Sequence, residues 1–220
     1  MTPLNSVYPP WANSLFWLLS SAVVAGVIAV PLGLMIYVRT PYVTDVRKAV
    51  EQPIQFDHRH HVLDDGIDCL FCHYTADRAD AAPVPPTELC LGCHGQIWHD
   101  APILQTVRES FFYDIPIPWE RVNGVPDFVY FSHQIHVQRG VGCATCHGGV
   151  DEMPAVFATA PLTMEWCLDC HFAPERYLRP PDRVTDMNWD LPPAEQLRVG
   201  AEIRDRLGIS PPTTCTACHR

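Results

Sequence analysis

The first feature of the chain is a long apolar segment near its N-terminus. From Leu15 to Val38 no side chain is charged, and a bilayer core about 30 Å thick is crossed by about 20 apolar helical residues. Aromatic side chains flank this segment on both sides, as they do at the two interfaces of a membrane. The pattern predicts a transmembrane helix over residues 15–38, preceded by a short tail at 1–14. The segment is longer than the apolar region of a signal peptide, and no A-x-A cleavage site follows it.

After this segment the hydrophobic pattern is weak. The clearest soluble helix opens at Pro192-Pro193 and stops at Gly208, with Leu197, Ala201 and Leu207 on one side. Proline accounts for 22 of the 220 residues, about twice its average usage, so long regular helices and sheets are not expected. The sequence therefore predicts a mainly α and irregular fold with little or no sheet and a small apolar core.

The cysteines change this picture, because all ten fall into five copies of C-x-x-C-H with none left over. This motif is the signature of covalent haem attachment. Its two thiols reach the two vinyl groups of one porphyrin, and the adjacent histidine is the proximal ligand of the iron. We therefore expect five haem c groups. The attachment cysteines are Cys69, Cys72, Cys90, Cys93, Cys143, Cys146, Cys167, Cys170, Cys215 and Cys218, and the proximal ligands are His73, His94, His147, His171 and His219.

Two other uses of paired cysteines fit less well. The first two pairs have the spacing of a Cys₄ zinc ribbon, but zinc does not require a histidine after every pair, and five pairs leave one pair over. A thioredoxin-like C-x-x-C occurs near a βαβ pattern, and no such pattern is present. Zinc and thiol redox chemistry are therefore the weaker interpretations.

An internal repeat surrounds four of the five motifs. The pattern F-x-H-x-x-H-V begins at Phe56 and again at Phe131, and each copy precedes two C-x-x-C-H motifs. We predict two dihaem modules, at residues 56–94 and 131–171. The remaining segments are a linker at 39–55, an inter-module segment at 95–130, and a C-terminal helix with the fifth haem motif at 172–220.

The repeated histidines are candidates for the second axial ligands of the irons. Two histidines three residues apart lie on one side of a helical turn, and each is able to cap a different haem. This arrangement resembles small multihaem cytochromes of the c₃/c₇ type, in which the first histidine caps the haem of its own motif and the second reaches a neighbour. The resemblance implies distal ligation by His58, His61, His133 and His136.

The fifth haem lies outside the repeat, and its distal ligand is less constrained. We favour Met164, and the alternatives are Met153, Met187, His99 and His60. A methionine ligand raises the reduction potential relative to histidine. His60 lies outside the repeated pattern, so we expect it to be exposed or to contact a ligand residue without binding iron itself.

The net charge and the number of side chains available as axial ligands exclude some classes of function. The formal net charge of −10 argues against a nucleic-acid-binding protein, which needs a basic face. The side chains suffice for six-coordinate iron at every haem, so the sequence favours an electron conduit without an active site of its own. The alternatives are a membrane-anchored multihaem quinol dehydrogenase, with an open haem near the anchor on His73 or His94, and a multihaem reductase of a small oxyanion.

The central part of the chain carries a more specific resemblance. The stretches Pro116-Ile117-Pro118-Trp119-Glu120-Arg121-Val122 and Met164-Glu165-Trp166-Cys167-Leu168-Asp169-Cys170-His171, among others between Trp98 and His171, resemble the pentahaem, membrane-anchored cytochrome c component of bacterial alternative complex III. The resemblance implies a quinol-oxidising membrane complex. It also implies that the partners are other membrane subunits and an iron–sulfur subunit. The implied electron acceptor is a monohaem cytochrome c, a blue-copper protein or a terminal oxidase.

Covalent haem attachment takes place on the outer side of the bacterial membrane. We therefore expect a single-pass protein of the cytoplasmic membrane with its haem domain on the periplasmic face. Arg39, Arg47 and Lys48 follow the apolar segment, and the positive-inside rule alone would place them in the cytoplasm. The charge bias is weak on both sides, so the haem argument decides the orientation.

Overall fold

The computed structural model describes residues 8–219, and the chain divides into two compact units, 1–45 and 46–220. The described part of the first unit contains helix α1, Trp11–Tyr37, and a single turn, α2, Pro41–Thr44. The first seven residues of the predicted tail lie outside the described residues.

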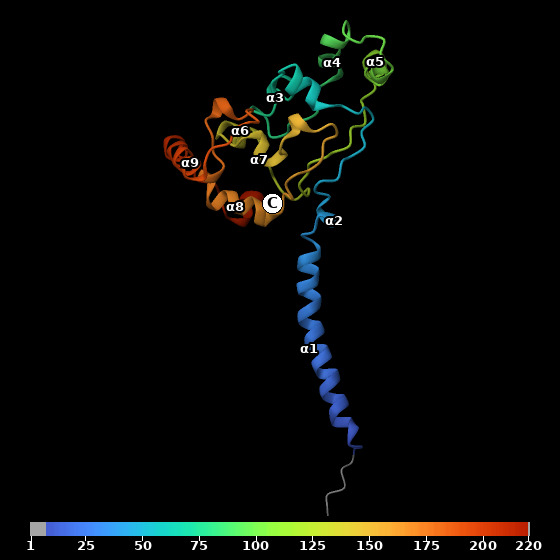
Figure 1. Ribbon diagram of the computed structural model, residues 1–220, viewed down its shortest axis with the longest axis vertical. Helices are drawn as coiled ribbons and strands as arrows, with labels where there is room; N and C mark the ends of the chain where they lie inside the picture. Colours follow the sequence, from blue (N-terminus) through green and yellow to red (C-terminus); the bar gives the residue numbers. More distant parts are fainter. Residues whose placement is uncertain (1–7, 220) are drawn as a thin grey trace, which may run out of the picture. The chain divides into compact units, whose positions relative to one another are not determined.

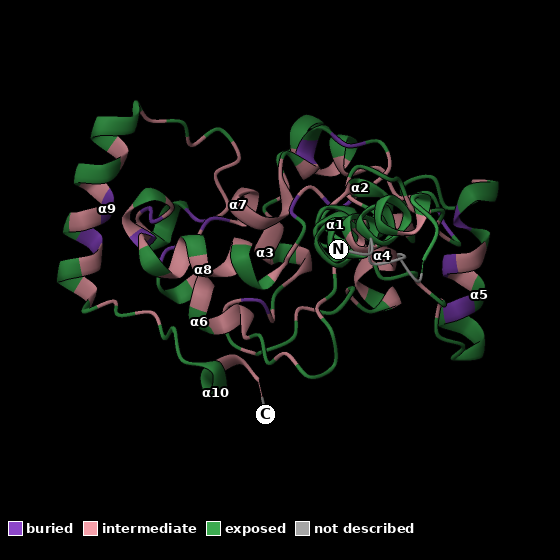
Figure 2. Ribbon diagram, turned by 90° about the horizontal axis from the view of Figure 1, so that it is seen from below, coloured by how far each residue is buried: buried purple, intermediate pink, exposed green. Residues whose placement is uncertain are grey.

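Helix α1 is 27 residues long, which corresponds to about 40 Å. None of its residues is buried, and its large apolar side chains are exposed; Figure 2 shows this helix mostly in the colour of exposed residues. It begins at Trp11 rather than at the predicted Leu15, because the uncharged residues after Pro10 continue the helix although Asn13 and Ser14 are polar. By length and composition α1 is able to cross a membrane.

The second unit consists of short helices joined by long loops (Figure 1). Its α-helices are α3 Cys69–Cys72, α4 Thr87–His94, α5 Gln105–Tyr113, α6 His133–Gln138, α7 Cys143–His147, α8 Met164–Phe172, α9 Pro193–Leu207 and α10 Cys215–Cys218. A π-helix, η1 Arg59–Asp64, and four 3₁₀ turns, η2 Pro102–Leu104, η3 Val150–Glu152, η4 Pro174–Arg176 and η5 Pro181–Arg183, complete it. In residues 8–219 the β-structure is limited to three isolated bridges, so the predicted lack of sheet is confirmed.

The protein buries few apolar side chains of its own. Ile54, Leu104 and Val107 form one small cluster, and Leu178 is the most deeply buried large side chain. The helices that carry haem motifs, by contrast, are mostly of intermediate exposure (Figure 2). The packing of this unit is therefore organised around the segments that carry the cysteines, as a small apolar core predicts.

Helix α9 ends at Gly208, as predicted, but a different face of it is buried. Gly200 and Ile203 are buried, whereas Leu197 is 44% exposed. The buried face is set by a close approach to η4: a Cβ at position 200 would lie 1.9 Å from the carbonyl oxygen of Glu175. Position 200 therefore requires glycine. The close approach of Gly200 to the Glu175 carbonyl, rather than the apolar periodicity, determines which face of α9 is buried.

The close approach at Gly200 gives a stability prediction. In an exposed helix interior, Gly→Ala stabilises by up to about 1 kcal/mol; here we expect Gly200→Ala to lower the free energy of unfolding by about 2 kcal/mol through overpacking. Arg206→Ala, at an exposed position of the same helix, should change it by less than about 0.5 kcal/mol. Thermal unfolding followed by circular dichroism measures both. Stabilisation by Gly200→Ala would contradict the docking of α9.

Candidate haem-binding sites

Each C-x-x-C-H motif lies on a single helical turn. In α3 and α10 the backbone N–H of the motif histidine donates to the carbonyl of the first cysteine, at 2.9 Å in both cases. A helical turn places cysteines three residues apart, and the histidine that follows, on neighbouring parts of one face. All ten cysteines are free thiols. The local geometry therefore offers two thiols and one imidazole together, as the covalent attachment of haem requires.

The two copies of F-x-H-x-x-H have the same ring geometry. Phe56 lies edge-on to His58 at 4.7 Å between centroids and stacks on His61 at 4.4 Å. Phe131 lies edge-on to His133 at 4.8 Å and stacks on His136 at 4.6 Å. In each copy one phenylalanine thus fixes both imidazoles, although η1 is a π-helix and α6 an α-helix.

Three histidines of these copies face the histidines of haem motifs. The ring centroids are 6.1 Å apart for His61 and His94, 6.4 Å for His133 and His147, and 6.2 Å for His136 and His171. Metal–imidazole bonds of about 2 Å on both sides of one ion, together with the half-width of each ring, separate two axial imidazoles by about 6 Å. The three pairs therefore have the spacing of bis-histidine ligation of a single iron.

His58 has no such ring contact, but among charged groups His73, the histidine of the motif that follows it, has the largest effect on its pKa. Burial lowers the pKa of His58 to about 4, and burial also lowers the pKa values of His73, His136 and His147. These imidazoles are therefore neutral at pH 7, which is the form that binds a metal.

Hydrogen bonds fix the tautomer of six of the repeat and motif histidines, because their Nδ1 atoms face backbone carbonyls. The acceptors are Asp57 for His61, Pro83 for His73, Ile97 for His94, Asp80 for His133, Ser132 for His136 and Pro212 for His171, at 2.7–3.4 Å. With Nδ1–H donating, Nε2 carries the free lone pair, as in metal-ligating histidines. Sequence reasoning missed these acceptors, since a backbone carbonyl has no signature in the sequence.

Asn123 supplies the equivalent contact to His147. Its amide nitrogen lies 3.2 Å from His147 Nδ1, and its Oδ1 atom is buried without a partner among the described residues. With the amide flipped, which changes its shape little, Oδ1 would accept a hydrogen bond from His147 Nδ1–H. Asn123 is thus the one side chain in this series of acceptors.

The motif cysteines also form a spatial series. Cys69 is hydrogen-bonded to Cys143, and the thiol of Cys72 lies near those of Cys90 and Cys93. Farther along, Cys146 lies near Cys167 and Cys170, and Cys167 lies near Cys218. The attachment sites therefore follow one another in the order 90/93, 69/72, 143/146, 167/170 and 215/218.

The fifth motif has a different environment. His219 pairs with Val129 in an isolated bridge and lies 5.7 Å from Phe128 between ring centroids. Within residues 8–219 no second imidazole faces His219 as in the three pairs. The side-chain candidates for its distal ligand are placed as follows: Met153 is buried, Met187 is half-buried, Met164 is exposed at the start of α8, and His60 and His99 are exposed with Nδ1 beside a carboxylate.

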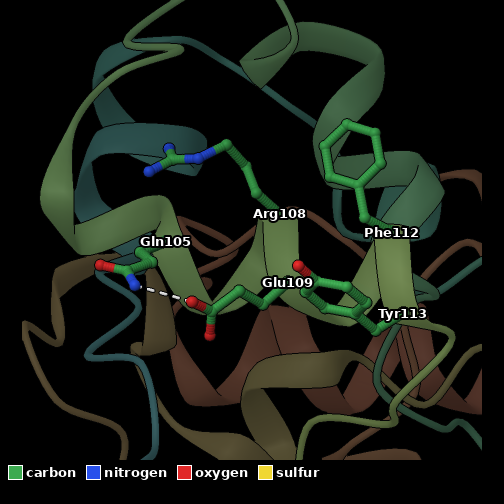
Figure 3. A pocket seen from close by; sticks show the side chains of 5 residues that line it. All are labelled: Gln105, Arg108, Glu109, Phe112 and Tyr113. Carbon is green, nitrogen blue, oxygen red and sulfur yellow. Dashed lines mark hydrogen bonds between the residues drawn. The ribbon is translucent and has the colours of Figure 1, made fainter.

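Two other features of the described residues bear on the site. No group of three or more His, Cys, Asp or Glu side chains between residues 8 and 219 is arranged to hold a metal ion. A hollow of about 540 Å³ lies along α5 and is lined by Gln105, Arg108, Glu109, Phe112 and Tyr113 (Figure 3). It contains none of the candidate haem residues.

Helical turns with paired thiols, facing imidazoles and anchored Nδ1 atoms are the local features that attachment of a c-type haem requires. In comparison with known proteins, residues 129–220 match the family described as cytochrome c7 and related cytochrome c. The chain is also 35% identical over 98 residues to a protein of Nitratidesulfovibrio vulgaris named "Menaquinone reductase, multiheme cytochrome c subunit". That match covers 44% of this chain and 46% of the relative, so the chain spans about half the length of that relative.

Proposed function

We propose that this chain binds five haem c groups and relays electrons within a membrane-bound, quinol-oxidising complex of the alternative complex III type. The observation that carries the proposal is the set of three imidazole pairs at 6.1–6.4 Å, each joining a repeat histidine to a motif histidine. A cytochrome whose irons are held between two imidazoles leaves no iron position for a substrate, so it serves transfer rather than turnover.

The ligand assignment follows the pairs. We assign His61 with His94, His133 with His147, and His136 with His171, and we assign His58 to His73 as the remaining members of the same pattern. When bound, the haems supply reversible one-electron chemistry. The protein holds six of these imidazoles by contacts between Nδ1 and a backbone carbonyl, which leaves Nε2 free for an iron. Burial lowers the pKa values of His58, His73, His136 and His147 and so favours their neutral, metal-binding form.

For the fifth haem we propose Met164 as the distal ligand to His219. Met164 and Cys167 lie three residues apart on α8, and Cys167 lies beside Cys218 of the fifth motif. This places Met164 on the part of α8 next to that motif. Met153, Met187, His60 and His99 are the alternatives, and substitution of each distinguishes them.

The order of the attachment sites defines a path. Electrons would enter or leave at the motif of His94 or at that of His219, with the motifs of His73, His147 and His171 between them. We further propose that α1 anchors the chain as a single membrane span with the haem unit on the periplasmic face. Partner subunits would then include an iron–sulfur protein, with a monohaem cytochrome c, a blue-copper protein or an oxidase as acceptor.

The experiment that tests this function uses the full chain in its native membrane. Mass spectrometry of the mature protein should give five covalent haems. Electron paramagnetic resonance should show only low-spin iron, and a carbon monoxide difference spectrum should show no adduct. Copurification with an iron–sulfur protein and a polytopic membrane protein should define the complex. Fewer than five haems, or purification without partners, would contradict the proposal.

One observation favours a second candidate, a quinol dehydrogenase or reductase with an open haem. Among the described residues His219 lacks the facing imidazole that His94, His147 and His171 have, and the repeat supplies no histidine for it, so the fifth iron is the place where an open position would arise. A high-spin haem that binds carbon monoxide, and that is lost when His219 is replaced, would establish this alternative in place of the conduit.

A further inference from the structure

A buried arginine lies beside the middle motif of the series and, among the described residues, forms no ion pair; the acidic side chain that acts on it, Asp186, is paired with Arg183. Arg179 is only 6% exposed. Its Nη1 atom donates to the carbonyl of Asp186 at 2.7 Å, while its Nε–H is buried with no partner among the described residues. A buried charge without a partner is costly, so an arginine in this position calls for an explanation.

The guanidinium lies directly against the segment that leads into the third motif. A Cβ at Gly142, the residue before Cys143, would lie 2.2 Å from Arg179 Cζ and 2.3 Å from Nε. Two further contacts hold this register: the N–H of Arg179 donates to Gly140 at 2.8 Å, and the N–H of Cys143 donates to Val184 at 2.9 Å. Glycine at position 142 is therefore what allows the positive charge to lie this close to the attachment point.

The other neighbours of Arg179 leave its charge in place. The indole of Trp189 lies 5.8 Å from the guanidinium carbon, and this ring attracts a cation without neutralising it. Burial lowers the pKa of Arg179, but a guanidinium stays protonated at any physiological pH. In a medium of low polarity such a charge acts over a longer distance than it does in water.

From these contacts we infer that Arg179 raises the reduction potential of the haem held by Cys143, Cys146 and His147. The inference rests on the proposed attachment of haem at this motif. Reduction adds one electron to that haem, and an unpaired positive charge nearby favours the more negative state. Burial and hydrogen bonding around a haem are the protein's means of tuning its potential, and the free Nε–H offers a donor to a haem carboxylate. Arg179 is therefore a positioning residue for the middle haem of the path, not a ligand.

The test is a redox titration of the membrane-extracted holoprotein, resolved into its component haems by their spectra. Arg179→Met removes the charge and keeps the volume. It should shift one reduction equilibrium at least tenfold towards the oxidised state, about 59 mV for one electron, and leave the other haems unchanged. Arg179→Lys keeps the charge and should retain most of the potential. Arg206→Met, at an exposed arginine of α9, is the control for loss of a positive charge and should shift none.

Each outcome of this titration is decisive. Haem content is measured on the wild type and on every variant. If the wild type carries no haem at the middle motif, the proposed function fails, and the inference about Arg179 fails with it. With five haems present, unchanged potentials in Arg179→Met overturn the inference. Equal shifts in Arg179→Met and Arg179→Lys also overturn it, because they indicate a packing role. If Arg179→Met fails to load haem, Arg179→Gln replaces it, and equal potentials in the Gln and Lys variants again overturn the inference.

Discussion

Replacement of His136 by alanine is expected to convert one haem from a low-spin to a high-spin form that binds carbon monoxide, while the haem count stays the same. The ring of His136 faces that of His171 at 6.2 Å, and its Nδ1 lies 2.7 Å from the carbonyl of Ser132. Removing the ring takes one axial ligand from the iron, whereas the thioether bonds at Cys167 and Cys170 do not depend on it. Electron paramagnetic resonance and a carbon monoxide difference spectrum measure the change.

The matched control for this prediction is His60→Ala. His60 also belongs to the first F-x-H-x-x-H segment, but it is exposed and its Nδ1 lies 2.9 Å from a carboxylate oxygen of Asp64. Its removal should leave all irons low-spin. A high-spin signal in His60→Ala, or its absence in His136→Ala, would show that the ring pairs of the structure are not the ligand pairs of the haems.

The double substitution Cys143→Ser, Cys146→Ser should remove one haem and divide the path. These cysteines lie between two groups of attachment sites, with Cys69 on one side and Cys167 on the other. After rapid reduction through the proposed partner complex in membranes, only the haems on the donor side should be reduced quickly. Stopped-flow spectroscopy, with haem content determined on the same sample, measures this fraction.

Cys215→Ser, Cys218→Ser is the control for the order of the path. It also removes one haem, but at the end of the series beside Cys167, so the four remaining haems stay in sequence. They should be reduced together, quickly if electrons enter at the motif of His94 and slowly if they enter at that of His219. Fast reduction of all four remaining haems in the Cys143, Cys146 variant would contradict the order inferred from the cysteine contacts.

The C-x-x-C-H motifs could be recognised from the sequence because their signal is local. Five C-x-x-C-H motifs need only one helical turn each, and such a turn forms from the motif's own backbone. Helix α1 was predictable for the same reason, since an uncharged segment of this length has few other structures open to it. In both cases the determining residues are adjacent in sequence.

The parts that escaped prediction depend on contacts between distant segments. The apolar pattern of α9 indicated Leu197 as a core position, but the contact of Gly200 with the Glu175 carbonyl turned the helix to another face. Similarly, the acceptor for His133 is the carbonyl of Asp80, 53 residues away. Any residue type provides such a carbonyl, so only the fold identifies it.

The position of Asp80 also shows that the segment matched by the family is held by residues outside that segment. The match to the cytochrome c7 family begins at residue 129. Helix α6 lies within that match, but it is held by the earlier loop at residues 77–80. The N–H groups of His133 and Gln134 donate to the carbonyls of Asp80 and Ala79, and the Gln138 side chain donates to the carbonyl of Asp77. A fragment cut at the boundary of the resemblance would lose the backbone that orients a histidine facing its own haem motif. The segment that matches the cytochrome c7 family is therefore held in part by residues 77–80, which lie outside the match.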